Sequence, residues 1–135
     1  MRAKQFEKSY LALCDGIFDI SSGTINAPIA RKPNSIIERC IDNNGDTAIT
    51  HYEVVKTVDN YSVVKCTLET GRTHQIRVHM AYINHPLLGD TLYGTSSPLI
   101  SRQALHAYKI TFIHPITKQK LEFNCKIPAD FENLI

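Results

Sequence analysis

The segment from residue 70 to residue 79, TGRTHQIRVH, gathers the polar side chains of this sequence that are best suited to chemistry. It holds two arginines and two histidines, and it lies between an apolar strand-like segment and a predicted helix. Arginine side chains and the free N–H groups at a helix start both bind anions, so the segment favours a phosphate or carboxylate ligand. No other part of the sequence supplies an obvious nucleophile with a partner base. The segment therefore predicts one half of a site.

The role of Arg77 depends on which anionic group it binds. Its planar guanidinium can bind a substrate phosphate or a carboxylate supplied by another part of the protein. A structural acid such as Asp90 is an equally good partner, because charge clusters occur in structural as well as functional settings. The residues alone leave both interpretations open.

The histidines do not form a metal or acid–base motif. His74 and His79 are five residues apart, so they do not share the helix face that a metalloprotease HExxH motif requires. We expect them to cap the helix, to hydrogen-bond to the backbone or to contact a phosphate. His106 alternates onto one face of a strand and is expected to be a satisfied core or edge histidine.

The cysteines are widely scattered, with no CxxC pair and no spacing typical of zinc ligands. They are Cys14, Cys40, Cys66 and Cys125. We therefore expect no metal site. Cys14 and Cys66 lie in apolar strand-like segments, which favours reduced residues buried in the core.

The composition is that of an ordinary globular protein. Apolar residues make up 43% of the chain and charged residues 21%, which argues against extensive disorder, and 135 residues fit one domain. The formal net charge is only +2, so binding to nucleic acid would depend on a local basic patch. No apolar run is long enough to cross a bilayer, and the N-terminus lacks the apolar stretch of a signal peptide, so the default expectation is a cytoplasmic location.

Candidates for a basic patch are basic residues that have aromatic residues nearby. They recur at Arg31, Lys32, Tyr93, Arg102, Tyr108 and Lys109. These residues would suit contacts to an RNA backbone if the fold gathered them onto one face. A solvated surface explains each of them singly.

The elements that must position these residues are mainly strands. Alternation and turn residues predict strands over residues 8–14, 24–30, 48–56, 61–69, 103–112 and 121–127. Pro28 confines the second of them to a sheet edge or an irregular extended stretch. The third and fourth strands should form one hairpin, and the fifth and sixth another. A stub over residues 2–7 is compatible with a helix.

One principal helix should pack on this sheet. Thr73 is the expected N-cap, and the helix should end near residues 84–86, where a proline disfavours helical geometry in the residue before it. Ile76, Met80 and Ile83 form an apolar stripe that should face the sheet. A short terminal turn of helix is expected over residues 128–134. The predicted fold class is α+β, a mixed, mainly antiparallel sheet with one principal packed helix.

The order of several motifs resembles the C-terminal half of the RluA-type pseudouridine synthases. The motifs are KSYLAL, GDTAITHYEV, LETGRTHQIRVHMAYINHPLLGDTLYG and ALHAYKITFIHP, and together they cover nearly the whole chain. The resemblance implies that residues 1–135 are the C-terminal part of a catalytic domain whose cleft admits a flipped-out uridine. It also implies an enzyme that isomerises uridine to pseudouridine in ribosomal or transfer RNA without a cofactor.

The resemblance assigns roles to particular residues. Tyr10, in KSY, corresponds to the active-site tyrosine that stacks on the target base and takes part in proton transfer, although a strand aromatic filling the core is the alternative. Arg77 corresponds to the arginine that pairs with the catalytic aspartate. Leu105, in LHA, corresponds to an aliphatic residue of the base pocket. Arg72 and His74 are left for substrate binding through the RNA backbone, or for structural roles.

The catalytic aspartate of that family lies in an HRLD motif upstream of the KxY strand, and no HRLD occurs in this sequence. Its carboxylate initiates cleavage of the C1′–N1 glycosidic bond, after which the uracil rotates and C5 bonds to the sugar. We therefore expect this chain to be inactive alone. It would be a fragment of a longer enzyme, a truncated gene product, or a subunit completed by a separate N-terminal half.

The competing interpretation is a noncatalytic RNA-binding remnant. In either case the expected partners are RNA and the missing N-terminal half, with no membrane. Loss of that half would also leave unpaired sheet edges that favour self-association.

Overall fold

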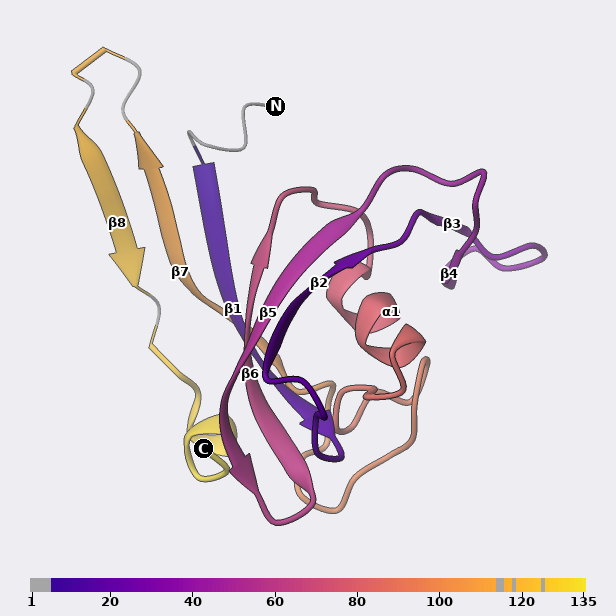
Figure 1. Ribbon diagram of the computed structural model, residues 1–135. Helices are drawn as coiled ribbons and strands as arrows, with labels where there is room; N and C mark the ends of the chain where they lie inside the picture. Colours follow the sequence, from indigo (N-terminus) through magenta and orange to yellow (C-terminus); the bar gives the residue numbers. More distant parts are fainter. Residues whose placement is uncertain (1–5, 114–115, 118, 125) are drawn as a thin grey trace.

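The fold is built on a six-stranded antiparallel sheet, shown in Figure 1. The structure is a computed structural model that describes residues 6–113, 116–117, 119–124 and 126–135. The strands lie in the order β2-β5-β6-β1-β7-β8, and β3 and β4 form a separate two-stranded sheet. The element bounds are β1 Phe6–Asp15, β2 Ser22–Asn26, β3 Ile29–Arg31, β4 Arg39–Ile41, β5 Ile49–Val58, β6 Tyr61–Leu68, α1 Gln75–Tyr82, β7 Leu105–Ile113, β8 Lys120–Asn124 and α2 Ala129–Glu132. The α+β class and both predicted hairpins are confirmed.

Strand β1 lies in the middle of the sheet and organises both of its faces. It pairs with β6 on one side and with β7 on the other, antiparallel in each case. Because side chains alternate along a strand, Ala12 and Cys14 enter one apolar cluster and Leu13 enters another. All three are fully buried. One strand thus joins two hydrophobic cores.

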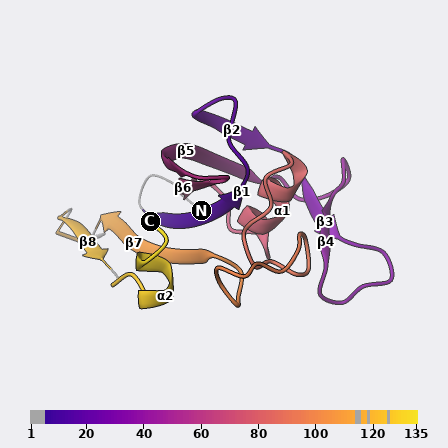
Figure 2. The ribbon, with the colours of Figure 1, turned by 90° about the horizontal axis from the view of Figure 1, so that it is seen from below.

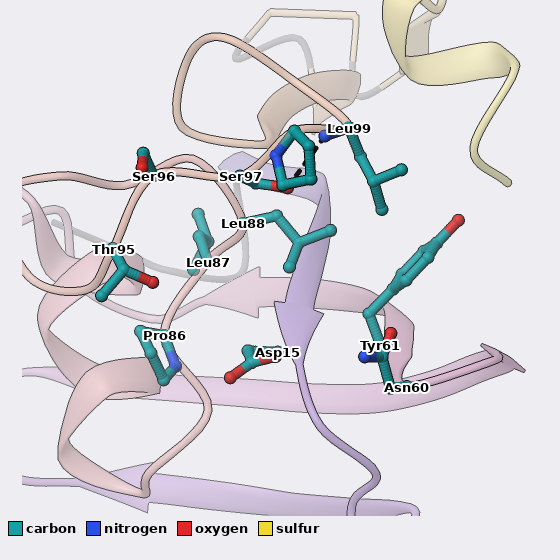
Figure 3. Close-up of a pocket in the computed structure, with 11 residues that line it drawn as sticks. Asp15, Asn60, Tyr61, Pro86, Leu87, Leu88, Thr95, Ser96, Ser97 and Leu99 are labelled. Atoms are coloured by element: carbon teal, nitrogen blue, oxygen red, sulfur yellow. Dashed lines mark hydrogen bonds between the residues drawn. The ribbon is translucent and has the colours of Figure 1, made fainter.

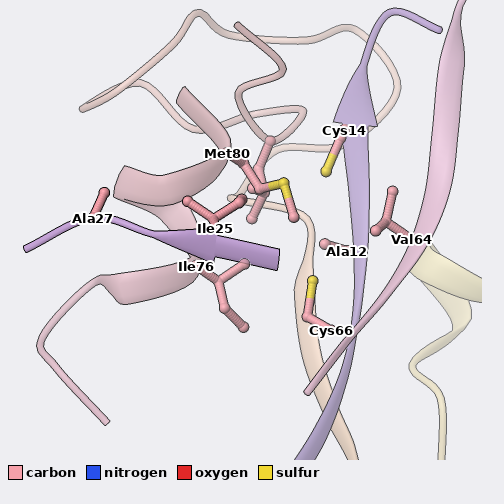
Figure 4. Close-up of a cluster of buried hydrophobic side chains, with 9 residues drawn as sticks. Ala12, Cys14, Ile25, Ala27, Val64, Cys66, Ile76 and Met80 are labelled. Carbon is pink, nitrogen blue, oxygen red and sulfur yellow. The ribbon is translucent and has the colours of Figure 1, made fainter. Parts of the chain in front are cut away.

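Helix α1 covers the face of the sheet that carries Ala12 and Cys14. Figure 4 shows Ile76 and Met80 of the helix pointing toward Val64 and the strands. Ile83 packs at the edge of the same cluster, so the predicted stripe is confirmed.

The predicted helix start is wrong by one residue. The N-cap is His74, which has a φ of 58° in the left-handed region and makes no side-chain capping bond. The N–H group of Gln75, which a Thr73 cap would bond, donates instead to the carbonyl of Arg72 at 3.1 Å, and the Oε1 atom of Gln75 accepts the hydrogen bond of the Arg72 N–H group at 3.0 Å. A side chain inside the helix therefore satisfies the backbone in front of it.

The opposite face of the sheet is covered by the C-terminal residues. Phe131 of α2 is fully buried against Leu13, Val63 and Ala104. The hydroxyl of Tyr61 donates a hydrogen bond to the carbonyl of Leu134 at 2.6 Å, which ties the end of the chain to β6. The terminal helical turn expected from the sequence is thereby confirmed.

The hairpin of β3 and β4 was not predicted. The expected strand over residues 24–30 divides at Pro28 into the edge strand β2 and the short strand β3. Figure 2 shows β3 and β4 beside α1 and away from β7 and β8. Ile29 and Val78 share a small apolar cluster there, which holds the hairpin on the helix.

Further predictions concern the N-terminal residues, the cysteines and membrane spans. The proposed helical stub over residues 2–7 is wrong for residues 6–7, which belong to β1 and pair with β7, while residues 2–5 lie outside the described residues. Cys14 and Cys66 are buried and free, and Cys125 lies outside the described residues. No helix in the described ranges is long and apolar enough to cross a membrane.

Truncation of Met80 should remove much of the stability that the packing of α1 on the sheet contributes. We expect Met80→Ala to lower the free energy of unfolding by about 2–5 kcal/mol, because it leaves a cavity between α1 and the sheet. Tyr82 belongs to the same helix but is exposed, so Tyr82→Ala should change stability by no more than about 0.5 kcal/mol. Urea denaturation measures both variants. Equal midpoints for the two would contradict this docking.

Candidate active site

One groove brings together all five site residues named from the sequence. Tyr10, Arg72, His74, Arg77 and Leu105 line a hollow of about 360 Å³ between β1, β7 and the start of α1. The remaining lining residues are Leu68, Gln75, Ile76 and Gln103. The groove therefore has an apolar floor, formed by strand side chains, and a wall of cationic and polar groups.

Tyr10 lies at an irregular point of β1. The pairing of β1 with β7 shifts register between Ser9 and Tyr10, and such bulges redirect the side chain next to them. The ring packs against the core cluster under α1 and also lines the groove, so both interpretations of Tyr10 describe part of its surroundings. Burial raises the pKa of the Tyr10 phenol, which keeps it protonated at neutral pH.

Arg77 is held by the buried carboxylate of Asp90. Its Nε and Nη2 atoms donate to the two carboxylate oxygens at 2.8 and 2.9 Å. The Asp90 side chain is fully buried, whereas that of Arg77 is 14% exposed. The structural partner considered from the sequence is thus present, and the same guanidinium still lines the groove. Among the described residues, nothing accepts a hydrogen bond from its Nη1 atom.

Asp90 is ionised despite its burial. Burial alone would raise its pKa, but the hydrogen bonds from Arg77 and from the backbone N–H groups of Tyr93 and Leu92 outweigh that effect and bring the pKa below its usual value. Gly89, which precedes it, has a φ of 72°, and a Cβ atom there would lie 2.1 Å from the carbonyl oxygen of Arg102. Glycine is therefore required for the turn that delivers Asp90.

Tyr93 supports Arg77 from the other side, and the sequence analysis missed this role. The guanidinium carbon of Arg77 lies 5.1 Å from the centre of the Tyr93 ring, a cation–π arrangement. The hydroxyl of Tyr93 accepts the N–H group of Arg39 at 2.9 Å and lies 2.8 Å from Nδ1 of His74. Burial, with the nearby positive charges of Arg77 and Arg39, lowers the pKa of His74. A neutral His74 accepts the hydrogen bond of the Tyr93 hydroxyl at Nδ1. The sign of this role in the sequence was that Tyr93 follows Asp90, the possible partner of Arg77, by three residues.

Gln75 and His79 explain why the segment is so polar. The Nε2 group of Gln75 donates to the hydroxyl of Thr50 at 2.9 Å and to the carbonyl of Ile49 at 3.0 Å. Thr50 in turn lies 2.8 Å from Nδ1 of His79, and Nε2 of His79 donates to the carbonyl of Ala27 at 2.9 Å. This buried chain of bonds joins α1 to β5 and to the segment after β2. His79 thus bonds to backbone, one of the alternatives expected for it.

The basic residues considered for an RNA surface differ in their surroundings. Three of them pair with neighbouring carboxylates, Lys32 with Glu38, Arg102 with Asp130 and Lys109 with Glu122. Arg31 instead shares a second hollow with Arg39 and Arg72. The three paired residues suit the alternative of a solvated surface, whereas Arg31 lies with arginines that the sequence did not single out together.

The interpretation of His106 as a satisfied histidine is also wrong. Its Nε2 atom is buried and has no hydrogen-bond partner among the described residues. Its ring centre lies 6.3 Å from that of Phe131, on the apolar side of the sheet that faces α2. The alternation of residues along a strand predicts the face on which a histidine lies, but it does not predict whether a hydrogen-bond partner is present on that face.

A further hollow lies at the far end of β1, as Figure 3 shows. It is lined by Asp15, Asn60, Tyr61, Pro86, Leu87, Leu88 and residues 95–99, and its described lining contains no arginine or lysine. Asp15 and Tyr10 are five strand residues apart, a separation of about 17 Å. Its carboxylate therefore cannot serve the groove of Arg77.

No cluster of three metal-ligating side chains occurs in the part of the chain that the structure describes. The groups that line the groove have their own chemical capacity. It can stack a planar ring between apolar and aromatic side chains, and it can bind an anion at a fixed arginine.

The Arg77–Asp90 pair should be a major contributor to stability. We expect Asp90→Asn to lower the free energy of unfolding by about 3 kcal/mol, since it leaves the arginine charge without its buried partner. The exposed pair of Arg102 and Asp130 offers a matched control, and Asp130→Asn should cost at most about 1 kcal/mol. Chemical denaturation at neutral pH tests both. Similar losses in the two variants would contradict a special role for Asp90.

His79 should make stability depend on pH. Burial lowers the pKa of His79 below its usual 6.5, whereas the backbone bond to Ala27 acts in the opposite direction more weakly. The unfolded chain then binds a proton that the folded chain does not, so stability should be complete above pH 6.5 and should fall as the pH is lowered toward 5. Urea midpoints measured over this range should fall less steeply for His79→Gln than for the unchanged protein. An unchanged slope in the variant would exclude His79 as the cause.

Comparison with known proteins identifies the family. A family model described as RNA pseudouridylate synthase matches residues 1–82. An uncharacterized RNA pseudouridine synthase of Bacillus subtilis, YjbO, is 47% identical over 129 residues, which are 96% of this chain and 46% of that protein. The ribosomal large subunit pseudouridine synthase D of Haemophilus ducreyi is 39% identical over all of this chain and 46% of its own length.

The solved structures agree with the sequences. The human RNA pseudouridylate synthase domain containing 1 superposes with a TM-score of 0.77 at 29% identity, over 93% of this chain and 56% of that one. The present chain spans less than half the length of the curated relatives it matches. On the family match and these similarities, the chain belongs to the RNA pseudouridylate synthase family.

Proposed function

We propose that this chain forms the base-binding and arginine side of the active site of an RNA pseudouridine synthase that acts on ribosomal or transfer RNA. Residues 1–135 would be the C-terminal part of the catalytic domain. The observation that carries the proposal is the convergence of Tyr10, Arg72, His74, Arg77 and Leu105 on one groove. They come from three separate segments of the chain, so their meeting is a property of the fold.

The groove is suited to an unstacked uracil. Tyr10, Leu68 and Leu105 provide an aromatic and aliphatic surface at the edge of the core, on which a flipped base can stack. The isomerisation exchanges the C1′–N1 bond for a C1′–C5 bond and moves a proton from C5 to N1, with no net oxidation. The position of the Tyr10 ring, packed at the edge of the core and lining the groove, supports stacking as its main role. A part in proton transfer requires an acceptor beside its hydroxyl, such as the catalytic aspartate.

Arg77 is the group to which that aspartate would bind. Asp90 takes two of its N–H donors and fixes its orientation, while the remaining donors stay available. An arginine that is already positioned by a buried carboxylate loses little freedom when it binds a second one at the groove. Arg77 would then orient the catalytic carboxylate and keep it ionised.

The catalytic carboxylate itself would come from outside these residues. The sequence contains no HRLD motif. Asp90 is committed to Arg77, and Asp15 lines the hollow at the far end of β1. We therefore propose that the chain alone is inactive and that an N-terminal half, in the same polypeptide or a separate one, completes it. The expected setting of such RNA modification is the cytoplasm.

A complementation experiment tests this proposal. The chain would be mixed with the N-terminal half of the Bacillus subtilis relative YjbO and with RNA whose uridines carry tritium at C5, and release of tritium would be counted. We expect no release by the chain alone and release by the mixture. Arg77→Ala should lower the rate by about 100-fold or more, the usual effect of losing a positioned charged donor. Lys56→Ala, at an exposed position of β5 that does not line the groove, should retain activity.

The outcomes separate the competing interpretations. Release by the chain alone would refute its inactivity. Failure of the mixture, with both halves folded and bound to each other, would favour the noncatalytic RNA-binding remnant.

Self-association is part of the same proposal. In the described sheet β2 and β8 are the edge strands, each with one neighbour, and an unpaired edge can accept another strand. Sedimentation over a range of concentrations tests this, and adding the N-terminal half should suppress the larger species if it covers one of these edges.

A further inference from the structure

A second hollow adjoins the groove on the other side of Arg72. It has a volume of about 390 Å³ and brings together three arginines from β3, β4 and the segment before α1. These are Arg31, Arg39 and Arg72, and the rest of the lining consists of Ile29, Ala30, Asp46, Gly71 and Thr73. Arg72 belongs to both hollows, so a ligand could extend from one into the other.

The three arginines differ from the other arginines near the site in their partners. Arg77 and Arg102 each bind a carboxylate. Arg31, Arg39 and Arg72 have no carboxylate within ion-pair distance among the described residues, and Asp46 is too far from all three to form a pair. Three positive charges therefore face one negative charge across this hollow.

Neutral acceptors hold two of these side chains in place. The Nε group of Arg72 donates to the carbonyl of Thr47 at 2.7 Å. Nη1 of Arg39 donates to the carbonyl of Ile37 at 3.1 Å. Carbonyl groups orient a guanidinium without cancelling its charge, so the positive charges remain available to a ligand.

Space for a ligand backbone is available at Gly71. A Cβ atom on this glycine would meet no heavy atom within 4 Å, so the chain itself does not require a glycine there on steric grounds. A bare backbone beside three guanidinium groups lets a bulky anion approach closely.

The hollow is also linked to the groove through Tyr93. The backbone N–H of Arg39 donates to the Tyr93 hydroxyl, and the Tyr93 ring carries the guanidinium of Arg77. The strand that presents Arg39 is thereby held in a fixed relation to the groove.

We propose that Arg31, Arg39 and Arg72 form a binding site for a phosphate of the RNA backbone next to the uridine in the groove. The inference rests on the proposed function, because it takes RNA as the ligand of the groove. Guanidinium forks match phosphate oxygens, and phosphates follow every base along a strand. The site positions the strand and reads no base.

Salt-dependent binding of single-stranded oligouridylate to the 135-residue chain tests the site. We expect Arg31→Gln and Arg72→Gln each to reduce the slope of log affinity against log salt by about 0.7–1, the loss of one phosphate contact. Arg39 is left unchanged, because its side chain also holds the turn of its hairpin. Lys56→Gln is the matched charge control on an exposed part of β5 and should leave the slope unchanged.

A second variant protects the test against structural damage. Gly71→Asp removes no contact and has room for its side chain, but it adds a negative charge to the hollow. It should weaken binding at low salt by about tenfold while the melting temperature stays the same. Equal binding by Gly71→Asp, by both glutamine variants and by the control would overturn the phosphate site, as would a lack of oligouridylate binding by the unchanged chain.

Tritium release by the complemented enzyme separates this proposal from the one on which it rests. Arg31→Gln should raise the RNA concentration needed for half-maximal release and leave the maximal rate unchanged, whereas Arg77→Ala lowers the rate itself. If Arg31→Gln changes neither binding nor release while Arg77→Ala abolishes release, the phosphate site is wrong and the enzyme proposal stands. If the salt slopes change as expected but no mixture releases tritium, the phosphate site stands and the enzyme proposal is wrong.

Discussion

The ion pair of Arg77 and Asp90 is the interaction on which the site depends most directly. A carboxylate that is fully buried is stable only when its charge is compensated, and here four N–H groups do so, two from Arg77 and one each from Leu92 and Tyr93. The same bonds shape the turn after Gly89 and place the Tyr93 ring beside the guanidinium. One buried charge thus fixes an arginine, a turn and an aromatic support.

Strand β1 supplies the frame for this arrangement. It contributes Tyr10 to the groove and apolar residues to both cores, so the groove adjoins the buried core of the sheet. The chain of bonds through Gln75, Thr50 and His79 then locks α1 onto β5. Because this network is buried and fully bonded, it holds the start of α1, and with it Arg72 and Arg77, in a defined position.

The distribution of arginine partners separates structural from binding roles. Arg77 is compensated within the fold and can orient another group without being reorganised itself. Arg31, Arg39 and Arg72 are positioned only by neutral groups or lie free of carboxylates in the described part of the chain, so their charge is available to a ligand. The two hollows meet at Arg72. A base and its neighbouring phosphate present the same two chemistries side by side.

The sequence by itself determined the main strands of the six-stranded sheet, two of its hairpins, the apolar stripe of α1 and the family. These depend on local periodicity and turn residues, or on motifs that are read in order along the chain. It also named five residues of the groove, Arg72, His74 and Arg77 as members of a polar segment suited to an anion, and Tyr10 and Leu105 through the resemblance.

Only the tertiary structure decided which polar groups meet. His74 takes the N-cap position, the side chain of Gln75 bonds to the backbone before it, and Tyr93 reaches Arg39 across 54 residues of sequence. The hairpin of β3 and β4 brings Arg31 and Arg39 to Arg72, whereas His106 is left without a partner. Periodicity specifies the face on which a side chain lies. Its partner depends on contacts between distant segments, which form only when the sheet and the helix pack together.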